Sequence, residues 1–185
     1  MDNRTPTDEL SHLLLMARDG DRDALTDLVR RAQPDLWRFC AAIVGAGAAD
    51  DATQDTFIRA WQGMHNFEGA SSAKTWLFAI AKRVCFDAGR RQQRAPKTMA
   101  EMPQARGDSQ EDRIVLEDLV ARLEPDRRAA FVLTQLFGLS YANTALVCDC
   151  PVGTIRSRIA RARGDLLAWS PEMAPGRDRT NGHPV

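Results

Sequence analysis

The stretch LSYANTALVCDCPVGTIRSRIARARGDLL, residues 139–167, has the pattern of a helix-turn-helix. Ser140 is one of the residue types that cap helix N-termini, and the helix after it is expected to run to about Cys148. The next two residues form a short turn. Pro151 suits the first turn of the second helix, because its missing N–H would have no hydrogen-bond partner there. The stretch therefore predicts two helices joined by a tight turn.

The second helix of this motif carries cations away from its apolar face. That face is formed by Ile155, Ile159, Ala162 and Leu166. The candidate DNA contacts, off that face or at its borders, are Thr154, Arg156, Ser157, Arg158, Arg161 and Arg163. Arginine can donate two hydrogen bonds to a guanine edge, and serine or threonine can bond bases or phosphates. Four arginines and one aspartate give residues 151–165 a charge of +3. We therefore expect this helix to read the major groove of duplex DNA; a solvated arginine face is the alternative.

Apolar residues recur at helical spacing through most of the remaining chain, as at Leu36, Phe39 and Ile43. No segment alternates like a strand, so no sheet is expected. The pattern stops from about residue 92 to 112, where prolines and polar residues are typical of a linker. The sequence thus predicts an all-α protein with two small helical domains joined by a flexible linker. The expected parts are a first domain at 1–95, a linker at 96–112, a helix-turn-helix domain at 113–169 and a disordered tail at 170–185.

A helix expected within residues 73–94 combines aromatic rings with cations. Its buried stripe is predicted to be Leu77, Ile80, Ala81, Val84 and Ala88, with Trp76, Lys82, Arg83, Phe86, Arg90 and Arg94 opposite. Six basic residues and Asp87 give residues 82–97 a charge of +5. Rings stack on unpaired bases while cations neutralise phosphates, so this face suits single-stranded nucleic acid. The candidate contacts are Asn66, Trp76, Lys82, Arg83, Phe86, Arg90 and Arg91. The loop at 65–74 could shape a pocket for a flipped base; alternatively, the two rings are core residues.

An acidic face precedes this helix, in AADDATQDTFIRAW at residues 48–61. Its members are Asp51, Gln54, Asp55, Ile58 and Gln62, and Phe57 and Trp61 are expected to be buried on the opposite side. Carboxylates around an apolar side chain favour docking of a basic partner, with a solvated face as the alternative. We do not expect these carboxylates to bind metal, because no histidine lies nearby at ligand spacing.

Composition restricts the remaining possibilities. The 185 residues include 25 Lys+Arg and 25 Asp+Glu, and 44% are hydrophobic, which excludes a disordered body. The N-terminus has no basic segment followed by an apolar one, so an unexported, cytoplasmic chain without a membrane anchor is expected. The cysteines, expected to be buried thiols, are Cys40, Cys85, Cys148 and Cys150. No P-loop, HExxH or nucleophile–base motif is present, so no enzyme, cofactor, metal or small-molecule substrate is expected.

The three segments, in this order, resemble the extracytoplasmic-function (ECF) sigma factors, a compact two-domain class of bacterial transcription initiation factors. DDATQDTFIRAW (50–61) looks like the family's core-polymerase-binding helix, FEGASSAKTWLFAIAKRVCFDAGRR (67–91) its −10 segment and LSYANTALVCDCPVGTIRSRIARAR (139–163) its −35 reader. The resemblance implies binding to core RNA polymerase, at the β′ clamp helices and the β flap, and to promoter DNA, with an anti-sigma factor as a further possible partner. A dimeric helix-turn-helix repressor or activator is the alternative function.

The sequence departs from the family pattern at several positions. Ala142, Asn143, Thr144 and Ala145 stand where the family usually has Glu-Glu-Ile-Ala. Asp149 replaces the usual turn glycine, and Arg83 replaces a frequent asparagine of the −10 segment. Asp55 stands for a common glutamate and keeps its charge.

Overall fold

The computed structural model describes residues 6–94 and 118–169. Within these ranges the chain forms helices, turns and loops and contains no β-strand, as expected. The predicted linker at 96–112 and the predicted tail at 170–185 lie outside the described residues, as does the side chain of Arg94.

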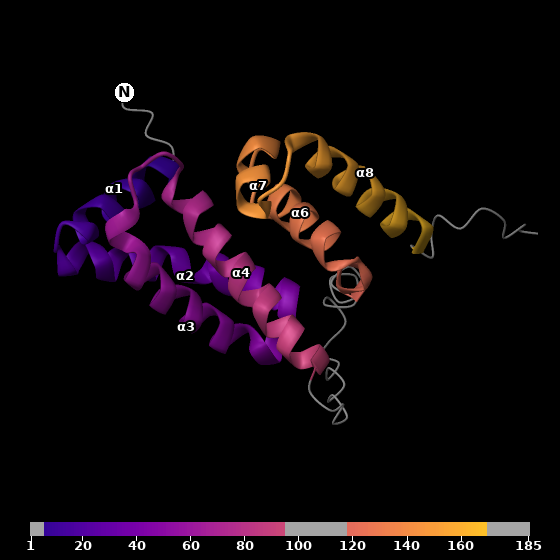
Figure 1. Ribbon diagram of the computed structural model, residues 1–185, viewed down its shortest axis with the longest axis horizontal. Helices are drawn as coiled ribbons and strands as arrows, with labels where there is room; N and C mark the ends of the chain where they lie inside the picture. Colours follow the sequence, from indigo (N-terminus) through magenta and orange to yellow (C-terminus); the bar gives the residue numbers. More distant parts are fainter. Residues whose placement is uncertain (1–5, 95–117, 170–185) are drawn as a thin grey trace, which may run out of the picture.

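The first helical group contains α1 (Pro6–Arg18), α2 (Arg22–Val44), α3 (Ala46–Gly63), a 3-10 turn η1 (Met64–Asn66) and α4 (Ala73–Arg94), as seen in Figure 1. Asp21 caps α2, because its carboxylate accepts hydrogen bonds from the backbone N–H groups of Asp23 and Ala24. Gly45 adopts φ 87° between α2 and α3, a conformation that glycine tolerates without strain. The turn folds α3 back along α2, and both helices pack against α4.

The second group contains a helical segment at 118–122, then α6 (Pro125–Gln135), α7 (Tyr141–Cys148) and α8 (Val152–Trp169). The predicted helix-turn-helix is confirmed: Ser140 Oγ accepts a hydrogen bond from Asn143 N at 3.1 Å, and α7 ends at Cys148. Pro151 immediately precedes α8, and its carbonyl accepts from Thr154 N at 2.9 Å. Pro151 is thus the cap of α8 and not, as predicted, part of its first turn.

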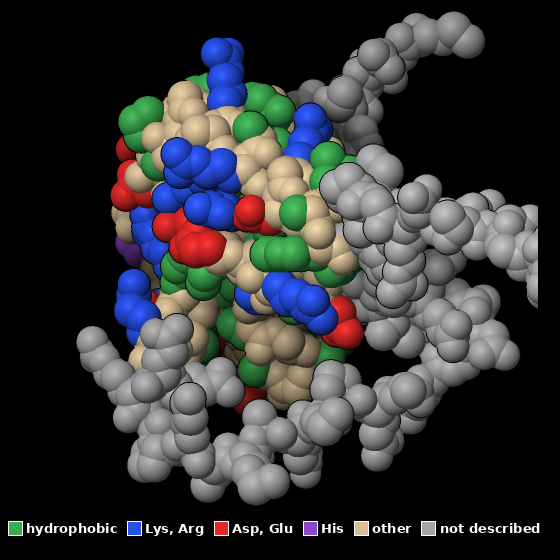
Figure 2. Space-filling model, turned by 90° about the vertical axis from the view of Figure 1, so that its right-hand side faces the viewer, with side chains coloured by type: hydrophobic (Ala, Val, Ile, Leu, Met, Phe, Trp, Pro, Cys, Tyr) green, Lys and Arg blue, Asp and Glu red, His purple; other side chains and the backbone are tan. Residues whose placement is uncertain are grey.

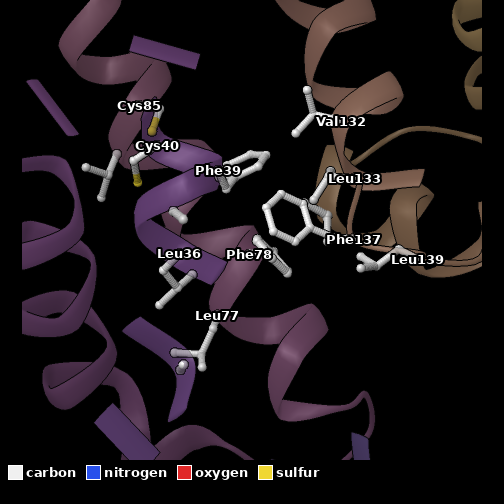
Figure 3. Close-up of a cluster of buried hydrophobic side chains, with 14 of the residues drawn as sticks. Leu36, Phe39, Cys40, Leu77, Phe78, Cys85, Val132, Leu133, Phe137 and Leu139 are labelled. Atoms are coloured by element: carbon white, nitrogen blue, oxygen red, sulfur yellow. The ribbon is translucent and has the colours of Figure 1, made fainter. Parts of the chain in front are cut away.

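The two groups pack against each other through an aromatic cluster (Figure 3). Phe137, which follows α6, places its ring centroid 4.9 Å from that of Phe78 on α4 and 6.3 Å from that of Phe39 on α2. Arg128 on α6 also donates a hydrogen bond to the carbonyl of Ile43, at 3.0 Å. One continuous core therefore spans both groups, a contact that the sequence pattern did not predict.

This packing changes which residues of α4 are buried. Three of the five predicted stripe residues, Leu77, Ala81 and Val84, are buried, whereas Ile80 and Ala88 are half-buried. Phe78 and Cys85, which the prediction omitted, are fully buried. The reason is that α4 has neighbours on two sides: α1, α2 and α3 on one, and α7 on the other.

Candidate nucleic-acid and protein interfaces

The outer face of α8 is basic and accessible. Ile155, Ile159 and Ala162 are buried, as predicted, and this turns the polar positions outward. Arg156 and Arg161 are exposed, and neither pairs with a carboxylate within the described ranges. Figure 2, which views the molecule from the side where α8 lies, shows Lys and Arg side chains at several places on this face, some of them beside Asp or Glu. Two guanidinium groups are thus available to an anionic partner.

The other predicted residues of α8 have neighbours. Ser157 Oγ donates to the Thr154 carbonyl at 2.9 Å, within the helix. Arg163 is exposed and donates to Gln135 Oε1 at 3.2 Å. Arg158 is half-buried and forms an ion pair with Asp126 on α6 at 2.9 Å. The sequence placed Arg158 and Arg163 together at the borders of the apolar face, but packing separates them: Arg158 is half-buried and Arg163 is exposed.

The basic residues of α4 also differ in exposure, some being accessible and one covered. Arg83, Arg90 and Arg91 are exposed, and Arg90 pairs with Asp87 one turn earlier. Lys82 is largely covered by α7: its Nζ donates to the Cys148 carbonyl at 3.3 Å. The Lys82 ammonium also lies 4.6 Å from the centroid of the Phe86 ring, a cation–π contact.

The two aromatic candidates and Asn66 occupy different surroundings. Trp76 is half-buried, with its ring centroid 5.4 Å from that of Phe67, and it packs against the core. Phe86 is also half-buried against the core. Asn66 is exposed at the end of η1. The prediction that Trp76 and Phe86 project away from the core is therefore wrong for both rings: Trp76 packs on Phe67, and Phe86 packs against the core beneath the Lys82 ammonium, as the alternative of core residues had it.

The acidic face of α3 is accessible at four of its five predicted positions. Asp51, Gln54, Ile58 and Gln62 are exposed. Asp55 instead forms an ion pair with Arg59 at 3.0 Å. Arg59 also reaches Asp87 on α4, at 3.3 Å. The hydrogen bonds from Arg90 and then from Arg59 hold the pKa of Asp87 below its usual value.

Trp61 was expected to be buried, and this is wrong: 58% of it is exposed. The buried face of α3 consists of small residues: Ala49, Ala52, Thr53, Thr56 and Ala60. Small side chains allow close approach of α3 to its neighbours, so the larger rings lie on the flanks. Phe57, on one flank, is half-buried.

A pocket of about 510 Å³ adjoins the acidic face, lined by residues of α1, α2, α3 and α4. Its walls include Trp37, Ile58 and Trp61, with Leu25 and Val29 further along α2. Trp37 Nε1 donates a hydrogen bond to Asp50 Oδ1 at 2.8 Å and thereby joins α2 to α3. Trp37 is not among the residues predicted from the sequence, although a large ring off the apolar stripe of α2 was a signal for it.

The thiols are mostly buried, as expected. Cys40, Cys85 and Cys148 are buried, and Cys150 is half-buried. Burial raises the pKa of Cys148 to about 11. No three His, Cys, Asp or Glu side chains come together as a metal site in the described ranges. No helix in those ranges is long and apolar enough to cross a membrane.

Two family descriptions match separate parts of this chain. Residues 28–95 match "Sigma-70 region 2", and residues 113–166 match "Sigma-70, region 4". The chain belongs to the ECF sigma factor family, because a relative of that name is 46% identical to it over 84% of its length. Together with the helical structure of the described residues, the two matches confirm an all-α protein of two helical domains, and they set aside the dimeric regulator. As a sigma factor, the chain binds core RNA polymerase and directs it to promoter DNA.

Similar proteins include several ECF sigma factors. The ECF RNA polymerase sigma factor SigC of Mycobacterium tuberculosis (strain CDC 1551 / Oshkosh) is 46% identical over 165 residues, covering 84% of this chain and 88% of the relative. The ECF RNA polymerase sigma-E factor of Escherichia coli (strain K12) is 33% identical over 177 residues, covering 85% of this chain and 93% of the relative.

Two solved structures share the fold. CnrH in complex with the cytosolic domain of CnrY gives a TM-score of 0.70 at 26% identity, covering 87% of this chain and 96% of that one. RpoE in complex with the anti-sigma factor NepR from Bartonella quintana gives a TM-score of 0.65 at 29% identity, covering 77% of this chain and 93% of that one.

Proposed function

We propose that this sigma factor divides its work among three surfaces: α3 docks on core polymerase, α4 binds the unpaired −10 strand and α8 reads the −35 duplex. The observation that carries the assignment of α8 is the pair of exposed guanidinium groups at Arg156 and Arg161, which have no carboxylate partner among the described residues and lie opposite buried Ile155 and Ile159. No catalytic step is needed, because binding to unpaired bases offsets part of the cost of unstacking them.

The polymerase surface comprises the acidic face of α3 and the adjoining pocket. Its residues are Asp51, Gln54, Asp55, Ile58 and Gln62, with Trp37 and Trp61 at the pocket. The carboxylates suit basic side chains of the β′ clamp helices, and the pocket suits an apolar side chain from the same element. The second domain contacts the β flap. Asp55 is the least direct of these contacts, since its carboxylate is already paired with Arg59.

The −10 surface runs along α4 and the loop before it. Arg83, Arg90 and Arg91 are the accessible cations, and Asn66 is the polar group of the loop. Lys82 joins the set when the second domain moves away from the closed arrangement seen here, in which α7 packs on α4 and covers this lysine. Phe86 and Trp76 complete the set, but both rings are half-buried and Trp76 packs on Phe67 of its own domain, so stacking of bases on either ring requires that the side chain first turns outward.

The −35 surface is the outward face of α8, with Thr154, Arg156, Ser157, Arg158, Arg161 and Arg163.

We assign residues 1–95 and 113–169 as the two domains, 96–112 as the linker that spans the distance between the promoter elements and 170–185 as a tail. The protein works in the cytoplasm and is not an enzyme. The complex of RpoE with NepR supports an anti-sigma factor as a further partner.

Co-purification with core polymerase, followed by run-off transcription, tests the polymerase surface. Asp51→Lys reverses an exposed charge on α3 and is expected to weaken core binding about tenfold. Asp27→Lys is the matched control, since Asp27 lies on α2, pairs with Arg30 and is not on the proposed surface. Equal core affinity for the two variants would remove α3 from the polymerase interface.

A further inference from the structure

One carboxylate, Asp126, connects the two proposed DNA surfaces. It lies in the first turn of α6. Its Oδ2 is 2.9 Å from Nη2 of Arg158 on α8, and its Oδ1 is 3.9 Å from Nζ of Lys82 on α4. A residue assigned to the −35 surface and a residue assigned to the −10 surface thus share a single anionic partner.

The charged groups of this contact are partly buried. The exposed fractions of the side chains are 15% for Lys82, 22% for Arg158 and 35% for Asp126. Partial burial lowers the screening of these charges by water and salt. A phosphate that approaches either cation therefore competes with Asp126 for it.

The turn of the helix-turn-helix strengthens the same contact. Lys82 donates to the carbonyl of Cys148, the last residue of α7, where helix carbonyls carry partial negative charge. Arg158 donates to Cys150 Sγ at 3.5 Å. Lys82 is therefore held by a carboxylate and a carbonyl oxygen, the kind of oxygen-rich surroundings that a nucleic-acid backbone would offer.

We propose that Asp126 is an intramolecular stand-in for a DNA phosphate, which holds Lys82 and Arg158 in the free factor and links their release. DNA that engages α8 competes with Asp126 for Arg158, weakens the closed arrangement and frees Lys82 for the unpaired strand. By linkage, binding at one surface raises affinity at the other. This inference rests on the proposed function of α4 and α8 as DNA contacts.

A zero-length carbodiimide cross-link tests the contact in the unmodified full chain. The reagent joins an amine to a carboxylate that touches it, so the Lys82–Asp126 isopeptide is expected among the tryptic products of the free protein. A saturating short duplex of random sequence is expected to suppress it. Lys82→Arg, which keeps the charge and removes the reactive amine, is the control and should give no such product. Absence of the cross-link in the free chain overturns the proposal.

Asp126→Asn tests the competition with DNA. Its apparent affinity for the same duplex is expected to rise about three- to tenfold, because the binding-competent fraction of the chain increases. Asp165→Asn is the matched control: it also lies in the second domain, also removes one negative charge and also frees an arginine, Arg127, paired at 2.8 Å. Asp165 does not touch α4, so its variant should change affinity by less than about twofold.

The outcomes distinguish failure of the phosphate stand-in from failure of the proposed DNA-binding function. Equal gains for Asp126→Asn and Asp165→Asn would reduce the effect to net charge and overturn the phosphate stand-in, as would a cross-link that persists when the parental chain is saturated with duplex. Failure of both the parental chain and Asp126→Asn to bind the duplex would instead overturn the proposed function, and the inference with it. Because the cross-link uses the parental sequence, the result does not depend on the stability of a variant.

Discussion

At the scale of single residues, side chains of the same type on one helix have different roles because their neighbours differ. Arg156 and Arg161 extend from α8 without a carboxylate partner in the described ranges, while Arg158 is held by Asp126. Arg163 lies between these cases, exposed but hydrogen-bonded to Gln135. Availability to DNA therefore follows packing and not residue type.

Arg156→Ala and Arg161→Ala are expected to affect DNA binding differently. If Arg156 bonds a guanine edge, its loss should cost about 1–3 kcal/mol and relax preference at one −35 position. If Arg161 contacts phosphate, its loss should weaken all sequences alike and lower the salt slope by about one. Binding of duplexes with single −35 substitutions at two salt concentrations measures both effects. Arg30→Ala, on α2, is the control for charge loss; parental behaviour of both α8 variants would contradict the assignment.

The four cysteines should differ in reactivity for a similar reason. Cys150 is half-buried, whereas Cys40, Cys85 and Cys148 are buried. Contact with Cys40 and burial both raise the pKa of Cys85, and burial raises that of Cys148 to about 11. Because a reagent must reach the sulfur, the half-buried Cys150 is expected to react quickly with an aromatic disulfide reagent near neutral pH, and the three buried thiols slowly. Cys150→Ser should remove that fast phase, and a fast phase that survives the substitution would contradict this account.

At the scale of elements, the α7–α8 turn is the least ordinary piece of backbone. Asp149 ends α7 with φ 52° and ψ 54°, and its N–H bonds the carbonyls of Ala145 and Leu146. It is the only residue other than glycine with positive φ in the described ranges. The family's usual glycine at this position therefore has a physical reason: a Cβ is disfavoured in the left-handed region.

Asp149→Gly is expected to stabilise the chain by about 0.5–1 kcal/mol, because relief of left-handed strain exceeds the added entropy of the unfolded state. Asp149→Ala keeps the Cβ and loses the local polar group, so it should be less stable than the parent. Urea denaturation followed by circular dichroism measures both. A glycine variant less stable than the parent would show that the aspartate side chain contributes more than the strain costs.

The ion pairs between α3 and α4 are expected to weaken in acid. The pKa of Asp87 is lowered by Arg90 first and then by Arg59, which also joins Asp55. A carboxylate with a lowered folded-state pKa stabilises the protein above its unfolded-state pKa, and this contribution is lost as pH falls through the folded-state pKa. Asp87→Asn should therefore flatten the fall in melting temperature between about pH 5 and 3. Asp51→Asn, on the exposed face of α3, should leave that slope unchanged; a parental slope for Asp87→Asn would contradict the coupling.

At the scale of the whole molecule, the closed arrangement depends on Phe137. Its ring contacts Phe78 and Phe39, and only 8% of the residue is exposed. The contact buries surface from both domains that each would otherwise expose to water. An aromatic cluster and the Asp126 pairing are thus two different kinds of contact between the same two domains.

Phe137→Ala should uncouple the domains. Removing a buried ring costs about 3–5 kcal/mol, and here much of that loss falls on the interdomain contact. Calorimetry is expected to change from a single transition to two, and solution scattering to give a larger radius of gyration. Leu136→Ala, at the neighbouring exposed position, should keep the parental profile. A single transition for Phe137→Ala would place the coupling elsewhere.

The helices and the turn of the second domain could be predicted from sequence, because a cap such as Ser140 and an apolar face such as Ile155 and Ile159 act over a few residues. The same spacing, with the family resemblance, indicated the three candidate surfaces.

Tertiary structure alone decided which of the candidate residues are accessible. Trp61 is exposed because small residues line the contact of α3, and Lys82 is covered because α7 packs on α4. Asp126 and Lys82 are 44 positions apart in the sequence, so periodicity within one helix carries no information about their meeting. Contacts between distant segments are selected by the total burial of apolar surface, which only the folded chain defines.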